Sequence, residues 1–180
     1  MPDQTTTCFG DYDERILGLL GNQAAVAIQT AQWVERDRER QRLARDMELA
    51  RTIQRSLCPA EPPAVVGWRF AAWQRSCDAT GGDYYDYLLC PAGCDLIVGD
   101  VSGHGLGAAL YMSTARACLR ALHGTAPTER VLERVNVLLE SDLSDDSFMT
   151  LLSVGIDADG RVSYVSAGHD PPLVWRAAAT

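Results

Sequence analysis

The sequence predicts an α+β fold with a largely antiparallel sheet, preceded by a long N-terminal helix. After residue 58 the expected elements follow the order strand, hairpin, two helices and hairpin. Helices that are adjacent in sequence, with strands on either side, are typical of α+β rather than alternating βαβ folds. With 180 residues, of which 47% are hydrophobic, the chain has enough apolar side chains for the core of one ordinary domain.

The first expected element is a helix from about residue 13 to residue 57. This segment contains no proline, and only Gly18 and Gly21 interrupt it. A charged run at 35–42 (ERDRERQR) separates two apolar stripes in different registers. The first stripe has steps of four and three residues, the spacing of a helical seam. Its members are Leu20, Ala24, Ala27, Ala31 and Val34.

A helix of this length spans about 60 Å at 1.5 Å per residue. Such a rod cannot bury an apolar stripe against itself, so it needs a partner helix. We therefore expect a parallel coiled coil that makes the chain a homodimer. A helix that packs on its own domain is the alternative.

Three prolines, at 59, 62 and 63, end this helix and mark a boundary. A helix is expected at 106–123, because this stretch is rich in Ala, Leu and Met. A second helix is expected from Thr128, which follows a proline, to about residue 139. An acidic loop follows at 141–147. Short β-like periodicity predicts the strands, with hairpin turns at CPAGC and at an Asp-Gly pair. The expected strands are 68–74, 84–89, 95–101, 148–156, 161–166 and 173–175.

Charge and composition exclude several functional classes. The formal net charge is −8, and all 16 basic residues are arginine, which disfavours a polybasic surface for nucleic acid or anionic lipid. No apolar run approaches the roughly 20 residues that a membrane span needs. Of the six cysteines only Cys90 and Cys94 lie close together, which disfavours a zinc site. We expect a cytoplasmic protein that binds neither nucleic acid nor membrane.

Two glycine–aspartate segments carry the expected chemistry. Asp83 lies in GGDYYD (81–86) and Asp100 lies in GDVSGHG (99–105), each at the edge of an expected strand. Glycine permits close approach of a ligand, and aspartate oxygens suit Mg²⁺ or Mn²⁺. If neighbouring strands bring the two carboxylates together, their repulsion favours a bound cation. A simple turn at each aspartate is the alternative.

The glycine loop that follows Asp100 allows three other interpretations. Gly103, Gly105 and Ala108 match G-x-G-x-x-A of dinucleotide-binding folds, but a second helix follows where a parallel strand is required. Ser102 stands one place late for the G-x-S-x-G nucleophile elbow. Anion binding by backbone amides at the start of the next helix is compatible with a metal site.

The three histidines have different expected roles. His104 is flanked by glycines and is a candidate proton donor to a leaving group, with a solvated loop histidine as the alternative. For His169, in the turn AGHDPP, we expect a structural hydrogen bond. His123 is expected to interact with a helix C-terminus.

Five segments in this order resemble the PPM-type metal-dependent serine/threonine phosphatases. Within that family they are most similar to the bacterial SpoIIE/RsbU-like branch, which regulates sigma-factor switches. The segments are LARDMELARTIQRSLCP (43–59), GGDYYD (81–86), GDVSGHGLGAAL (99–110), FMTLLSVGID (148–157) and SAGHDPPL (166–173).

The resemblance implies an α/β/β/α sandwich and an active site with two Mg²⁺ or Mn²⁺ ions. A water or hydroxide between the ions would attack a phosphoserine or phosphothreonine directly. By this resemblance Asp100 would bridge both ions, Val101 would ligate through its backbone carbonyl, and Asp83 would hold one ion. The implied partner is a phosphorylated STAS-domain anti-anti-sigma protein.

The N-terminal segment 17–32 is similar to the closing helix of a GAF sensory domain. We therefore expect a GAF remnant at 1–32, a coiled-coil signalling linker at 33–58 and a partial phosphatase domain at 59–180. The family continues into a Thr-Asp-Gly segment and a later acidic residue, and Asp142, Asp145 and Asp146 do not match those positions. The expectation is a chain truncated at both ends, with part of the metal shell. A catalytically inactive fragment that dimerises or binds a partner is the alternative function.

Overall fold

The computed structural model describes residues 10–75, 78–91, 93–143 and 146–176. The chain divides into two compact units, residues 1–46 and residues 47–180. This division falls inside the segment expected to be the linker. The last turns of the long helix therefore belong to the second unit, which also contains every strand.

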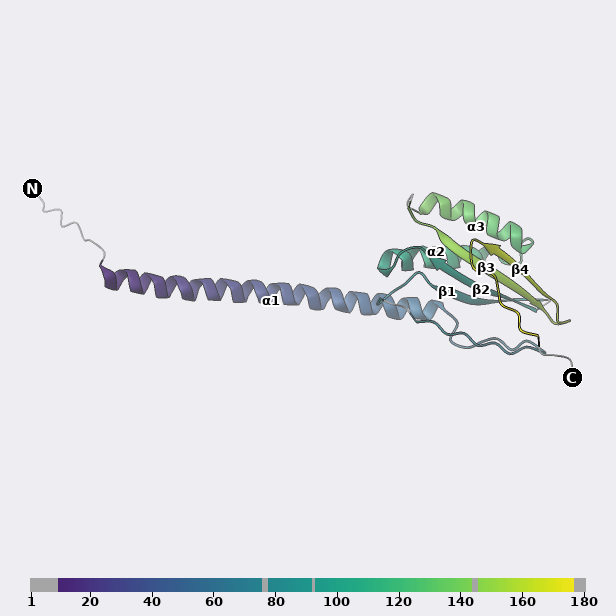
Figure 1. Cartoon of the computed structure of the whole chain (residues 1–180), viewed down its shortest axis with the longest axis horizontal. Helices are drawn as coiled ribbons and strands as arrows, with labels where there is room; N and C mark the ends of the chain where they lie inside the picture. Colours follow the sequence, from purple (N-terminus) through teal and green to yellow (C-terminus); the bar gives the residue numbers. More distant parts are fainter. Residues whose placement is uncertain (1–9, 76–77, 92, 144–145, 177–180) are drawn as a thin grey trace, which may run out of the picture. The chain divides into compact units, whose positions relative to one another are not determined.

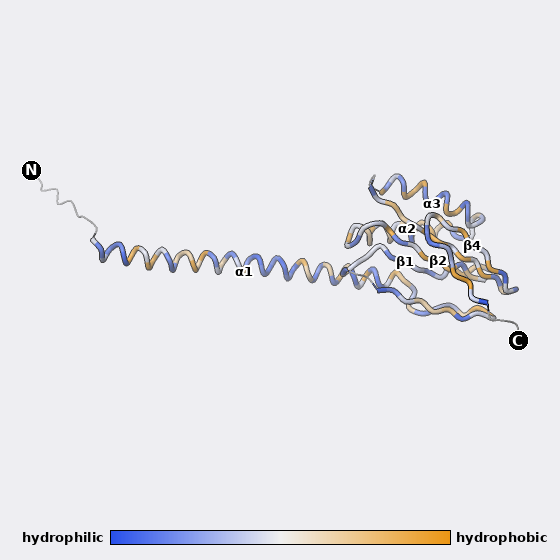
Figure 2. The backbone as a smooth tube through the Cα atoms, in the orientation of Figure 1, coloured by the Kyte–Doolittle hydropathy of each residue, from blue (hydrophilic) through white to orange (hydrophobic). Residues whose placement is uncertain are grey.

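The long helix α1 spans Asp11–Leu57 and confirms the expected N-terminal helix. Its first turn carries acidic residues, which interact favourably with the positive end of the helix dipole. None of its described residues is buried, and Leu17 and Leu20 are 61% and 59% exposed. Figure 2 shows apolar residues recurring along α1, interrupted by a hydrophilic stretch. The helix thus presents an apolar stripe to solvent.

The second unit is built on a four-stranded antiparallel sheet in the order β1-β2-β3-β4. The strands are β1 (Tyr84–Cys90), β2 (Gly93–Val101), β3 (Met149–Asp157) and β4 (Val162–Ala167). Both expected hairpins are confirmed. The β3–β4 turn ends at Gly160, whose φ of 83° lies in the left-handed region that glycine adopts at little cost.

Two helices connect β2 to β3 and pack on one face of the sheet (Figure 1). They are α2 (Gly105–Leu122) and α3 (Thr128–Asp142), close to the expected bounds. Buried residues recur on α3 at steps of one, three and four, which matches an amphipathic helix facing a sheet. In β1 buried and less buried residues alternate, so one face of the strand is directed at the helices.

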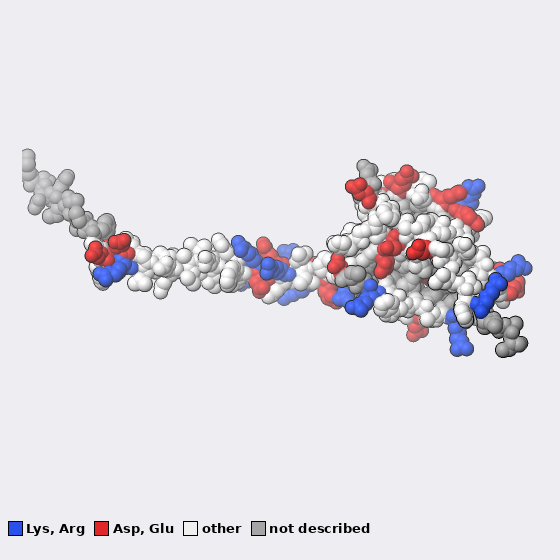
Figure 3. Space-filling view, in the orientation of Figure 1, with Lys and Arg blue, Asp and Glu red and all other residues white. Residues whose placement is uncertain are grey.

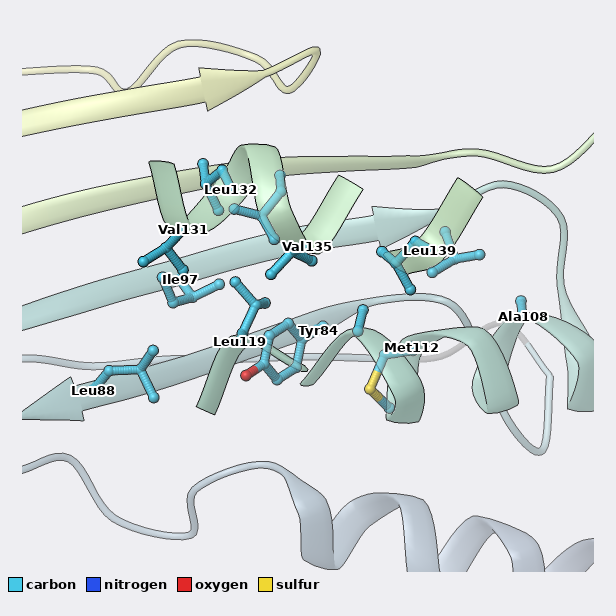
Figure 4. Packing of buried hydrophobic residues seen from close by; sticks show 13 residues of the cluster. Tyr84, Leu88, Ile97, Ala108, Met112, Leu119, Val131, Leu132, Val135 and Leu139 are labelled. Atoms are coloured by element: carbon cyan, nitrogen blue, oxygen red, sulfur yellow. The ribbon is translucent and has the colours of Figure 1, made fainter. Parts of the chain in front are cut away.

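The core lies between this helical layer and the sheet. Figure 4 shows Leu119 of α2 and Val135 of α3 close to Tyr84 and Ile97 of the sheet, and Met112 of α2 belongs to the same cluster. Met112 is 0% exposed and Tyr84 is 2% exposed. The first residue of β1, Tyr84, and the last residue of β2, Val101, are both buried in this core. The core packing therefore fixes these two strand ends next to each other.

Two expected strands are wrong. In the segment expected as a strand at 68–74, residues 69–74 are irregular, and Trp68 forms an isolated bridge with Val65. It contacts the sheet through side chains instead, since the Trp68 indole donates to the carbonyl of Asp157 at 3.3 Å. The segment 173–175 is also irregular, and Leu173 is fully exposed. A strand needs a hydrogen-bonded neighbour, and neither segment pairs with one among the described residues.

The α+β class with an antiparallel sheet is confirmed by these elements. The acidic loop expected at 141–147 begins later than predicted, because α3 continues to Asp142. Within the described ranges, no helix combines the length and the hydropathy that crossing a membrane would require.

Candidate metal centre

The pairing of β1 with β2 brings the two glycine–aspartate segments together. Tyr84 is the register partner of Gly99, Asp83 directly precedes β1, and Asp100 directly follows Gly99. Asp83 and Asp100 line the same surface pocket, whose volume is about 350 Å³. The juxtaposition of carboxylates that the sequence suggested is therefore present.

The carboxylate of Asp100 acts on that of Asp83. The pKa of Asp83 is raised above its usual value, first by burial, then by repulsion from the charge of Asp100, and third by a hydrogen bond with Asp100. Two carboxylates in one pocket cannot both ionise without cost, and a cation or a shared proton relieves that cost. The pocket thus favours a positive charge between these side chains.

Gly82 sets the approach between the Asp83 loop and the end of β2. A Cβ atom at this position would clash with the backbone carbonyl oxygen of Val101, so a side chain cannot be accommodated without backbone movement. The amide of Val101 donates to the carbonyl of Gly82 at 3.3 Å. Val101 is therefore held directly beside the loop that carries Asp83, although it does not line the pocket itself.

Two glutamines hold the Asp83 loop in place. Gln74 donates from its side-chain amide to the carbonyl of Asp83 at 2.9 Å. Gln54, near the end of α1, accepts a hydrogen bond from the amide of Gly81 at 3.1 Å and donates back to the carbonyl of the same residue. Sequence reasoning missed both glutamines. No local signal marks them, because a polar residue in a helix or loop is ordinary unless its distant partner is known.

His169 lies at the same pocket and makes the structural contact that was expected of it. Its Nδ1 lies 2.8 Å from the hydroxyl of Thr150, and its carbonyl accepts a hydrogen bond from Ser166 at 2.7 Å. These contacts fix the turn after β4. The position of His169 in the pocket wall was not anticipated.

His104 is placed apart from the two aspartates. It precedes α2, its side chain is 83% exposed, and its Nδ1 lies 2.7 Å from the Asp78 carboxylate. It does not line the pocket that contains Asp83 and Asp100. Its expected role as a proton donor stays a prediction.

The remaining motif residues have structural partners. The hydroxyl of Ser102 accepts a hydrogen bond from the amide of Phe148 at 2.9 Å, which ties the end of β2 to the start of β3. This engagement agrees with the poor match to a nucleophile elbow. Gly103 and Gly105 have φ values of 87° and 78°, as the sharp turn into α2 requires. His123 stands at the C-terminus of α2, where its Nε2 lies 2.9 Å from the Asp95 carboxylate.

The donor set fits a hard divalent cation, although it is small. Among the described residues no group of three or more His, Cys, Asp or Glu side chains is arranged to hold a metal ion. Asp142 ends α3, Asp146 lies in a turn, and Asp145 lies outside the described residues. Mg²⁺ is commonly held by one or two carboxylates, with waters completing its shell. The crowded oxygens of Asp83 and Asp100 meet this requirement.

The sequence is similar to a known protein family and to proteins of known function. Residues 91–180 match the family Stage II sporulation protein E (SpoIIE). The phosphoserine phosphatase RsbU of Bacillus subtilis (strain 168) is 26% identical over 137 residues, covering 75% of this chain and 41% of that protein. The phosphoserine phosphatase RsbP of the same strain is 28% identical over 139 residues, covering 73% of this chain and 34% of that protein. The chain thus spans less than half the length of these relatives.

A solved structure shows the same fold. The SiaA-PP2C domain of Pseudomonas aeruginosa superposes with a TM-score of 0.61 at 22% identity, covering 71% of this chain and 54% of that chain. At this identity the likeness concerns the fold alone.

Proposed function

The chain belongs to the SpoIIE family and carries a SpoIIE/RsbU-like domain of the PPM-type protein phosphatases, and from this premise we propose that it dephosphorylates a phosphoserine or phosphothreonine of a bacterial regulatory protein with the help of Mn²⁺ or Mg²⁺. The observation that carries the proposal is the pair of carboxylates, Asp83 and Asp100, in one surface pocket. RsbU and RsbP are both phosphoserine phosphatases by name, which supports phosphoserine as the substrate group.

In this proposal Asp83 and Asp100 hold the cation, and the backbone carbonyl of Val101 is the third candidate ligand. A bound divalent ion would neutralise phosphoryl oxygens and lower the pKa of a water molecule. Gln54 and Gln74 keep the Asp83 loop in position through backbone contacts. Since its hydroxyl is engaged by Phe148, Ser102 is not the nucleophile in this proposal.

His104 is the proposed proton donor to the departing hydroxyl of the substrate. Its exposure leaves the imidazole accessible to a protein substrate, and Asp78 can form an ion pair with its protonated form. The role requires the substrate to reach across from the carboxylate pocket to the start of α2.

The proposed partner is a phosphorylated STAS-domain protein in the cytoplasm, following the resemblance to the sigma-regulating branch. The proposed organisation keeps a GAF-like remnant at 1–32, a coiled-coil linker at 33–58 and the phosphatase domain at 59–180. A homodimer through α1 follows from its apolar stripe, none of whose members is buried. The alternative function, a dimerising or partner-binding fragment without catalysis, is favoured by the same stripe and by the small donor set.

The test is hydrolysis of a phosphoserine peptide with and without Mn²⁺. We expect Mn²⁺-dependent release of phosphate by the parent chain and its loss in Asp100→Asn, because that change removes one of the two charges that hold the cation. Asp159→Asn, in the exposed β3–β4 turn, is the matched control and should keep the parent rate. Activity that persists unchanged in Asp100→Asn would reject the assignment of Asp100. Absence of hydrolysis by the parent chain would favour the alternative function.

A further inference from the structure

A second pocket adjoins the candidate metal centre, and its charge is opposite to that of the whole chain. We call it the arginine pocket, because Arg51 and Arg55 of α1 and Arg75 of the loop before β1 line it. Its volume is about 650 Å³. In a chain with a net charge of −8, a pocket with three arginines marks a place for an anion. Figure 3 shows basic side chains gathered near the end of α1.

Two of the three arginine side chains have no partner among the residues that the structure describes. Arg55 and Arg75 form neither a hydrogen bond nor an ion pair with any other described residue. Arg51 makes one loose ion pair, at 3.7 Å, with Glu48. The single acidic side chain in the pocket wall, that of Asp78, faces His104 at 2.7 Å. The pocket therefore keeps an excess of positive charge that the described protein does not neutralise.

The arrangement costs stability in the absence of a ligand. Arg51 and Arg55 stand four residues apart in α1, so their like charges lie on the same face of the helix and repel each other. Arg75 adds a third positive charge at the same pocket. An anion bound among them would remove this repulsion. Guanidinium groups suit carboxylates and phosphates in particular, because their planar N–H donors pair with two oxygens at once.

The arginine pocket is next to the candidate metal centre. Gln74 and Arg75 line both pockets. The amide of Gln74 also contacts the backbone of Asp83, at 2.9 Å from its carbonyl oxygen. A peptide whose phosphorylated residue lies at Asp83 and Asp100 would therefore place neighbouring residues against the three arginines.

We propose that the arginine pocket binds acidic side chains, aspartate or glutamate, that flank the phosphorylated residue of the protein substrate. This proposal rests on the proposed phosphatase function and adds a determinant of substrate choice. Arg51 and Arg55 line the arginine pocket and not the pocket that contains Asp100, whereas Arg75 lines both. We therefore assign the arginines a role in docking the substrate. A second phosphate group on the substrate has the same charge chemistry and is distinguished by the experiment below.

The experiment compares three fluorescent phosphoserine peptides with one common core. The first carries four flanking glutamates, the second carries glutamines in their place, and the third carries the glutamines and a second phosphoserine. Binding to the full chain is measured by fluorescence anisotropy in EDTA, so that no hydrolysis interferes. We expect the glutamate peptide to bind about tenfold more tightly than the glutamine peptide, the factor expected for two partly exposed ion pairs. The difference should shrink as salt is added.

The variant Arg55→Ala/Arg75→Ala tests the pocket itself. It should abolish the preference for glutamate, whereas the control Arg134→Ala/Arg161→Ala, which removes two exposed arginines elsewhere, should keep it. Equal binding of the glutamate and glutamine peptides overturns the proposal, as does a gain confined to the doubly phosphorylated peptide. Hydrolysis of the same peptides in Mn²⁺ is measured separately. If no peptide is hydrolysed while the arginine-dependent preference persists, the proposed function fails and the docking site stands.

Discussion

An ion pair between the buried Asp86 and the partly exposed Arg120 connects β1, the strand that follows the candidate metal ligand Asp83, to helix α2. The Asp86 side chain is fully buried, and it accepts hydrogen bonds from Nε and Nη2 of Arg120, each at 2.7 Å. The hydroxyl of Tyr84 donates to the same carboxylate at 2.7 Å, and the amide of Tyr87 donates at 2.9 Å. The same carboxylate raises the pKa of Tyr84, after the larger effect of burial.

The informative perturbation is Arg120→Met, which keeps the length of the side chain and removes its charge. Breaking a buried ion pair by removing one partner costs about 3–5 kcal/mol, because a buried carboxylate is left without its counter-charge. Arg120 is itself 44% exposed, so water can partly replace the guanidinium. Two hydrogen bonds from Tyr84 and Tyr87 also remain. We therefore expect the free energy of unfolding to fall by about 2–3 kcal/mol.

The measurement is urea denaturation at pH 7, followed by near-ultraviolet circular dichroism. The control is Arg130→Met, which removes an arginine from an exposed ion pair with Glu133 and should change stability much less. The double variant Asp86→Leu/Arg120→Met should recover much of the loss, because no buried charge is left unpaired. An unfolding midpoint for Arg120→Met equal to that of the Arg130→Met control would refute this reasoning.

Two further predictions concern pH and self-association. Burial and Asp100 raise the pKa of Asp83 in the folded chain, so the folded state binds this proton more tightly than the unfolded state. In EDTA the free energy of unfolding of the parent, relative to that of Asp83→Asn, should therefore fall as pH rises from about 4 through the raised pKa. In the Asp100→Asn background this fall should be only partly reduced, because burial is the larger cause of the raised pKa. A difference in stability that does not change with pH would contradict this prediction. In sedimentation velocity of the full chain, Leu20→Glu should convert a dimer to a monomer, whereas Leu19→Glu, a similarly exposed position outside the seam, should not. A parent chain that sediments as a monomer would reject the coiled coil.

Local patterns predicted most of the regular structure. The proline-free amphipathic stretch specified α1, and turn residues between alternating segments specified both hairpins, because these signals act over a few neighbouring residues. The wrong strands at 68–74 and 173–175 have suitable composition but no partner strand among the described residues. Composition shows that a segment can pair, whereas pairing itself depends on a strand supplied from elsewhere in the chain.

The candidate site shows the same division. The two glycine–aspartate motifs were enough to predict Asp83 and Asp100 as candidate metal ligands, because the sharp turn and the oxygen donor are properties of glycine and aspartate themselves. Only the tertiary structure showed that β1 and β2 place the two carboxylates in one pocket, and that Gln54 and Gln74 hold the loop beside them. The arginine pocket was also invisible in the sequence, where Arg51 and Arg55 belong to a charged helix and Arg75 to a loop. Residues distant in sequence acquire a joint electrostatic role only when folding brings them together, because charge interactions depend on distance in space.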